Sequence, residues 1–301
     1  MKILYICPGN TPDYQCDLIF IGLRNILGES ITDLNKIEYL YRNYDRPREI
    51  LYGKGFTYTN TIDDLNIDRT DIESKIRNKY YDRVVYGSIH RNQQYLDLVL
   101  SVYSPNEIAF IDGEDLADNY DKRDCVYSVF GKGLYFKRES STNTNQVLPI
   151  QFCLPACKMA TSFDKSKTLA SIIPGEIRTY SFNTESEYYD EYRRSMFAIT
   201  TKKCGWDCLR HYEILGNGCI PIFNNLHNDE NNSIKNCPVN TMHLFPKGIV
   251  QHMTYVYNNN IQLPKNFFDD MCNHLWEYTR DYLTCESYCK KYLLPLIRGG
   301  I

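Results

Sequence analysis

The stretch SMFAITTKKCGWDCLRHYEILGNGCIPIF, residues 195–223, decides the fold. Residues 196–200 form an apolar run of strand length, and residues 206–215 then carry apolar side chains at helical spacing. The sequence Gly-Asn-Gly at 216–218 suits a helix end, because these residues tolerate positive φ. A second apolar run covers 219–223. The order strand, turn, helix, strand predicts a crossover unit of a parallel sheet.

Short apolar runs that end in turn-forming or polar loops recur on both sides of this unit. We predict strands at 2–7, 84–86, 108–111, 134–136 and 168–173. Pro149 and Pro155 open a linker, so we place one Rossmann-like domain at 1–150 and a second at 151–301. The predicted fold class is α/β, with two Rossmann-like domains facing a central cleft.

Composition restricts the function classes. The chain has 301 residues, 43% of them hydrophobic and 24% charged, which is typical of a globular protein with room for two cores. The formal net charge of -3 supplies no global basic field for nucleic acid or anionic membrane. No apolar run is long enough to span a bilayer, and the N-terminus lacks signal-peptide features, so we expect a cytoplasmic protein.

The chain contains 12 cysteines, and their spacing leaves two interpretations open. Cys204, Cys208 and His211 could line one helical face and resemble a metal site, although no fourth ligand is evident nearby. The alternative is a set of buried free thiols in a reducing compartment. We predict no metal site.

The loop between the predicted strand and helix of the central unit has features of an anion site. A helix N-terminus presents free N–H groups, Lys202 and Lys203 add positive charge, and Gly205 would let a phosphate approach the backbone. On the helix, Arg210 and Glu213 are three residues apart and share a face. Arginine suits a diphosphate, and a carboxylate suits two ribose hydroxyls. The alternative is a surface salt bridge on an ordinary helix.

The segment RHYEILGNGCIPIF resembles the R-x-x-E-A-L-x-x-G-C-I-P-V motif of exostosin-like glycosyltransferases, with Ile214 in place of the usual alanine. The chain also resembles uncharacterised glycosyltransferases of large viruses and bacteriophages, in which IDGED, YFKRE and KKxGWDCLRHYEIL recur in this order. The resemblance implies the GT-B fold, with Glu213 on the nucleotide ribose and Arg210 on the diphosphate. It also implies that 1–150 is the acceptor-side domain, that 151–301 is the nucleotide-sugar-binding domain, and that a terminal helix packs back on the first domain. His211, which lies inside the motif, joins the donor-site candidates.

The acceptor side is predicted at the loop Asp112-Gly113-Glu114-Asp115, which follows a predicted strand. Burying these carboxylates costs free energy unless they are solvated, paired with a cation or used in catalysis. One interpretation is a general base that deprotonates an acceptor hydroxyl, with Asp112 or Asp115 as the candidate and His90 on a neighbouring loop as the rival. The alternatives are a turn with a helix N-cap, or a calcium-like loop.

These observations predict a glycosyltransferase that moves a sugar from a nucleotide diphosphate, UDP- or GDP-linked, to an acceptor hydroxyl, on a glycan. The protein's own cations would neutralise the leaving group, so no metal or other cofactor is needed, and the exostosin resemblance points to an inverting reaction. We expect nucleic acid to be an unlikely partner. Two alternatives stay open: a DNA-base glycosyltransferase, and a non-catalytic carbohydrate-binding protein of the same fold. For a viral protein, the compartment would be the host cytoplasm.

Overall fold

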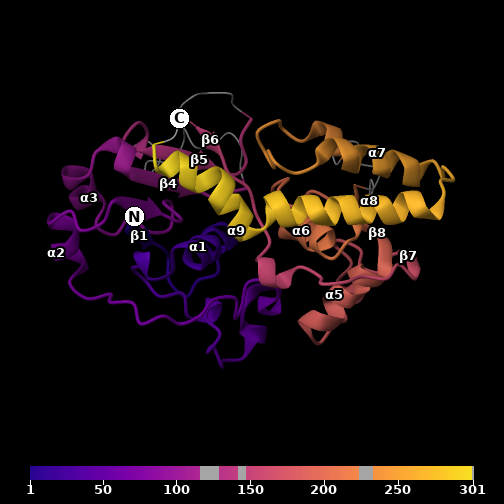
Figure 1. The fold of residues 1–301 in the computed structure, drawn as a ribbon, viewed down its shortest axis with the longest axis horizontal. Helices are drawn as coiled ribbons and strands as arrows, with labels where there is room; N and C mark the ends of the chain where they lie inside the picture. The colour runs from indigo at the N-terminus through magenta and orange to yellow at the C-terminus, as the bar shows by residue number, and fades with distance from the viewer. Residues whose placement is uncertain (116–128, 142–146, 224–232, 300–301) are drawn as a thin grey trace.

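The computed structural model describes residues 1–115, 129–141, 147–223 and 233–299. Figure 1 shows two bodies side by side, with the N-terminal half in indigo and magenta and the second half in orange. The yellow C-terminal helices run along the second body and then return across the first. The polypeptide therefore passes between the two bodies twice.

The first body is built on a six-stranded sheet in which every neighbouring pair of strands is parallel. The strand order is β2-β1-β3-β4-β5-β6. Its strands are β1 (Ile3–Ile6), β2 (Ile31–Asp33), β3 (Arg83–Tyr86), β4 (Ile108–Asp112), β5 (Leu134–Lys137) and β6 (Leu148–Pro149). The described helices are α1 (Tyr14–Leu27), α2 (Ile72–Arg77) and α3 (Leu96–Val102). Strands β1 and β4 are buried throughout, as expected for a sheet covered on both faces.

The second body contains the predicted crossover unit at residues 195–223. Its parallel sheet has the order β7-β8-β9, with β7 (Lys167–Leu169), β8 (Ser195–Thr200) and β9 (Ile220–Phe223). Its helices are α5 (Glu185–Arg194), α6 (Leu209–Gly216), α7 (Lys247–Asn258) and α8 (Lys265–Tyr278). The predicted strand–turn–helix–strand order is confirmed as β8-α6-β9. The two parallel sheets have the α/β architecture predicted for a GT-B fold.

After α8 the chain returns to the first body through π-helical turns at 279–283 and 289–293, with α9 (Cys285–Tyr288) and α10 (Leu294–Ile297). Helix α9 packs on α1. The two crossings are bonded to each other, because the Leu154 amide donates to the Leu283 carbonyl at 3.0 Å and the Cys285 amide donates to the Leu154 carbonyl at 2.8 Å. The proposed boundary at residue 150 falls between β6 and β7. Within the described residues, no helix combines the length and the apolar character needed to cross a bilayer.

The contact between α1 and α9 can be tested at Gly22. A Cβ at this position would lie 2.3 Å from the Cys285 carbonyl oxygen and 2.7 Å from the Cys289 Sγ atom. We predict that Gly22→Ala lowers the free energy of unfolding by about 1–3 kcal/mol, as overpacking does, measured by urea denaturation. Gly248→Ala is the matched control, since a Cβ there meets nothing within 4 Å. Equal stability of the two variants would contradict the close packing.

Candidate functional site

A cleft of about 960 Å³ opens between the two bodies. On the first body, the loops that follow β1 and β4 reach it, because the carboxyl ends of parallel strands share one edge of the sheet. On the second body, the loop after β8 and the first turn of α6 form the opposite wall. Candidates that line the cleft are Asp115, Lys203, Gly205, Arg210 and Glu213.

The basic wall of the cleft is centred on Arg210, in the first turn of α6. No side chain caps the N-terminus of this helix. The Arg210 guanidinium lies 5.9 Å from the ring centroid of Tyr180, and it forms no ion pair with a carboxylate of the described residues. The exposed Lys203 lies at the same wall, where its Nζ donates to the Tyr52 hydroxyl. A guanidinium, an ammonium and an uncapped helix start together favour an anion here.

Glu213 lies deeper on the same helix and is almost fully buried. Each of its carboxylate oxygens accepts a hydroxyl hydrogen bond: one from Thr57 of the first body, the other from Tyr188 of α5 at 2.6 Å. Burial raises the pKa of Glu213, while the two hydroxyls act in the opposite direction. The side chain is therefore arranged to bind two hydroxyl groups, and protein hydroxyls occupy both oxygens.

The floor of the cleft is organised by Arg138, which is 2% exposed and therefore needs every donor satisfied. Its guanidinium donates to the backbone carbonyls of Gly113 at 2.9 Å and Asp207 at 2.7 Å. It also pairs with Glu139 at 3.3 Å and with Asp115. Asp115 is thus a cleft-lining carboxylate whose charge is held in place by a buried cation.

The structure gives Gly205 a different role from the predicted phosphate approach. A Cβ there would lie 2.4 Å from Glu139 Oε1 and 3.0 Å from Asp115 Oδ1, so two carboxylates of the first body press against this glycine. The next turn is held by the Asp207 amide, which donates to Glu139 at 2.8 Å. Burial raises the pKa of Asp207 to about 7, against the opposing effect of Arg138. Gly205 therefore permits the contact between the two bodies.

Asp112, one of the two candidate bases in the loop, lies away from the cleft. Asp112 is fully buried at the end of β4, and the Lys137 Nζ lies 3.4 Å from it while the Tyr135 hydroxyl donates at 2.7 Å. Burial raises the pKa of Asp112, but these two partners outweigh it and leave that pKa below its ordinary value. The carboxylate is not among the described residues that line the cleft. It joins β4 to β5 instead.

His90 also lies behind the cleft wall. Its Nε2 atom is 2.7 Å from Glu114 Oε1, and Glu114 is the residue that lines the cleft. Burial lowers the pKa of His90 despite the carboxylates around it. A base role for His90 would therefore have to act through Glu114.

Neither His211 nor Lys202 is among the described residues that line the cleft. The His211 ring is fully buried, with Nδ1 2.8 Å from the Thr200 hydroxyl and Nε2 2.9 Å from the Trp206 carbonyl oxygen. Lys202 lies over the Trp206 ring at 5.4 Å. Their assignment to the donor site therefore has no contact in the described part of the cleft to support it, unlike that of Arg210 and Lys203. In the described part of the chain, no three or more His, Cys, Asp or Glu side chains gather as a metal site would require.

Sequence reasoning missed the part of the site that comes from residues 52–57. These residues belong to the first body, yet Thr57 reaches Glu213 and Tyr52 reaches Lys203. The sequence signal for a turn in this segment is the pair Gly53 and Gly55. In the structure both glycines have positive φ. Nothing in the residue pattern could indicate that the segment crosses to the other body.

No protein-family model matches the chain, and no curated protein matches it, so the exostosin-like and viral resemblances stay predictions. Two solved structures align with the chain at 10% identity and a TM-score of 0.49. One is an alpha-glucosyltransferase in complex with UDP and a 13-mer DNA containing an HMU base, matched over 99% of both chains. The other is an alpha-glucosyltransferase with UDP and a 13-mer DNA containing a central A:G mismatch, matched over 98% of both chains.

Both of these structures hold DNA together with UDP. What they hold is contrary to the expectations of a glycan acceptor and of nucleic acid as an unlikely partner.

The buried histidines predict a pH dependence of stability. The pKa of both His211 and His243 is lowered to about 3 by burial, below the ordinary value of 6.5. The unfolded chain therefore binds more protons between these values, and stability must fall as the pH drops from 6.5 towards 3. Each histidine contributes a slope of about 1.4 kcal/mol per pH unit in that window.

We expect chemical denaturation at pH 4.5 and pH 7.5 to show a smaller stability difference in His211→Gln or His243→Gln than in the wild type. His252→Gln, at an exposed position, should keep the wild-type difference. A wild-type stability that stays level across this window would contradict the neutral, buried imidazoles.

Proposed function

We propose that the protein transfers a sugar from a nucleoside diphosphate sugar to an acceptor hydroxyl. The observation that carries this proposal is the Arg210 guanidinium, which lines the cleft without a carboxylate partner among the described residues, at the uncapped start of α6. A cation kept in place without an ion pair is suited to a ligand anion. Lys203 lines the same wall, and Glu213 lies three residues further along the helix, which places it on the same helix face.

The chemistry follows from these positions. The acceptor oxygen attacks the anomeric carbon of the sugar, and the bond from that carbon to the diphosphate oxygen breaks. The electron pair leaves with the diphosphate, where Arg210, Lys203 and the N–H groups of α6 stabilise the growing charge. For an inverting reaction, Asp115 takes the proton of the acceptor hydroxyl, since Arg138 pairs with this carboxylate and holds it at the seam beside Gly205.

We further propose a hydroxylated base of DNA as the acceptor class. The two solved structures hold DNA, and the feature of this chain that suits a base is the aromatic wall of the cleft. The Tyr14 ring lies 5.6 Å from the Tyr52 ring and 6.1 Å from the Phe152 ring, and all three residues line the cleft. At the second wall, Ile177 is 88% exposed. An extruded base needs such stacking surfaces.

Donor binding can be tested with a matched pair of substitutions. Arg210→Gln should weaken the binding of UDP at least about tenfold, because it removes a charge-assisted contact to phosphate. Lys202→Gln removes the same charge from the neighbouring loop, on a side chain that packs on Trp206, and should bind UDP like the wild type. Isothermal titration with UDP, GDP and ADP measures both. Equal affinities of the two variants for every nucleotide would refute the assigned anion site.

The base can be tested with two carboxylates of one loop. With DNA containing a 5-hydroxymethyl pyrimidine as acceptor, Asp115→Asn should lower kcat about 10²-fold or more without weakening UDP binding. Asp112→Asn should instead destabilise the fold, because it leaves the buried Lys137 ammonium without its carboxylate. Transfer is followed by the mass of the oligonucleotide, with unmodified DNA as the blank. Full turnover by Asp115→Asn would eliminate it as the base.

A further inference from the structure

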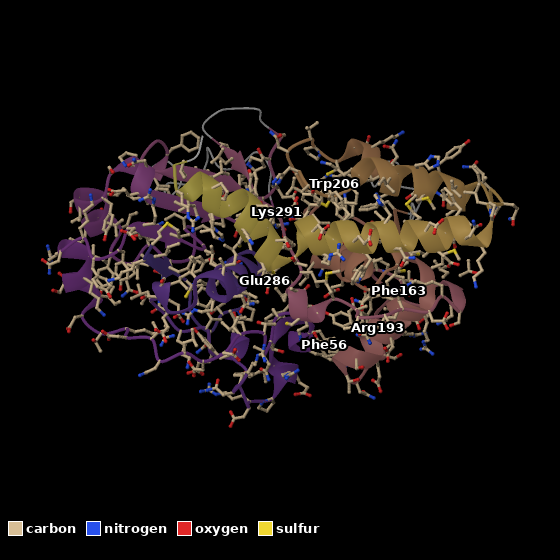
Figure 2. All side chains as sticks on the ribbon, viewed as in Figure 1. Phe56, Phe163, Arg193, Trp206, Glu286 and Lys291 are labelled. Carbon is tan, nitrogen blue, oxygen red and sulfur yellow. The ribbon has the colours of Figure 1, made fainter. Side chains whose placement is uncertain are left out.

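Residues 52–57, here called the strap, extend from the first body across the mouth of the cleft to the second. The Tyr52 hydroxyl accepts a hydrogen bond from Lys203 Nζ, and Lys54 Nζ donates to the Phe182 carbonyl at 2.7 Å. Further along, the Phe56 ring lies 5.9 Å from the Tyr188 ring, and Figure 2 shows Phe56 beside the second body. The strap therefore covers the wall on which the donor is proposed to bind.

The strap ends in a backbone conformation that its own sequence does not favour. Thr57 has a φ of 77°, in the left-handed region that a β-branched residue rarely adopts. The surroundings hold it there, because its amide donates to Glu185 Oε1 at 2.6 Å and Lys158 pairs with Glu185 at 2.7 Å. Contacts from the second body thus fix where the Thr57 hydroxyl points.

That hydroxyl points at the proposed ribose carboxylate. Thr57 Oγ1 donates to one oxygen of Glu213 and lies 2.7 Å from the Tyr189 hydroxyl, while Tyr188 donates to the other oxygen of Glu213. A buried carboxylate needs such donors when no ligand is bound. A ribose offers the same chemistry, because its two adjacent hydroxyls can donate to one carboxylate.

We propose that the Thr57 hydroxyl holds the place of a ribose hydroxyl on Glu213, and that a nucleotide with an intact ribose must displace it. Thr57 is then the residue that sets the affinity for the donor, and it discriminates nucleotides by their ribose hydroxyls. The inference rests on the proposed function, since it takes Glu213 as the ribose ligand. Because the strap belongs to the first body, loading the donor also removes a contact that holds the two bodies together.

The test compares UDP with 2′,3′-dideoxy-UDP, which lacks the competing hydroxyls, by isothermal titration. Thr57→Val keeps the size and branching of the side chain but removes the hydroxyl. It should bind UDP about tenfold more tightly than the wild type, because the hydrogen bond to the carboxylate no longer has to be broken. Its affinity for the dideoxy analogue should not change. Thr57→Ser should restore the wild-type affinity for UDP, because it restores the hydroxyl.

Thr59→Val is the matched control. The Thr59 hydroxyl donates to the Gly55 carbonyl at 2.8 Å and is equally buried, so this variant loses a hydroxyl beside the strap without touching Glu213. It should bind UDP like the wild type. A gain in affinity equal to that of Thr57→Val would overturn the proposal, because it would reflect a looser strap and not competition at the carboxylate.

A second measurement uses only the wild type. Amide hydrogen exchange at residues 52–57 should accelerate more on addition of UDP than on addition of dideoxy-UDP at equal saturation, because only UDP carries the hydroxyls that displace Thr57. Slower exchange with UDP, or weaker UDP binding by Thr57→Val, would show that Thr57 assists the donor, and the proposal would be wrong. If the wild type binds no nucleoside diphosphate, the proposed function fails as well. Binding of UDP with no effect at Thr57 refutes the strap proposal alone.

Discussion

The guanidinium of Arg138 is the interaction on which the site depends. It lies at the end of β5 and is almost completely buried, so each of its donors has to find an acceptor inside the protein. Those acceptors come from three stretches far apart in the sequence: the loop 112–115, Arg138's own strand end, and the turn before α6. One side chain thereby joins the wall that carries Asp115 to the wall that carries Arg210.

The charges around Arg138 explain why separating the two walls at this point would cost free energy. Asp115, Glu139 and Asp207 place three carboxyl groups around one guanidinium, and burial raises the pKa of both Glu139 and Asp207. Removing the cation would leave buried carboxyls that must take up protons or draw in water. The absence of a side chain at Gly205 lets Glu139 and Asp115 come this close to the second body. The floor of the cleft is therefore held by contacts that a ligand does not replace.

The mouth of the cleft is built differently. The strap meets the second body through hydroxyl groups and lysines, and its contacts to Glu213 and Lys203 have the chemistry that a ribose and a phosphate would offer. The proposed donor would replace the strap contacts while the Arg138 contacts persist. It would then enter between two bodies that the paired crossings at Leu154 keep joined.

Sequence patterns predict the residues that act within one short segment, and they miss the residues that act between the two bodies. The crossover β8-α6-β9, and Arg210 at the first turn of its helix, follow from periodicity within thirty residues or so. Thr57 and Arg138 act across the two bodies, which no local pattern encodes. The choice between Asp112 and Asp115 depended on register: Asp112 is the last residue of β4 and is paired directly with Lys137 on β5. Two oppositely charged neighbours on adjacent buried strands neutralise each other. A carboxylate therefore becomes available to a ligand only beyond the strand end, where Asp115 lies.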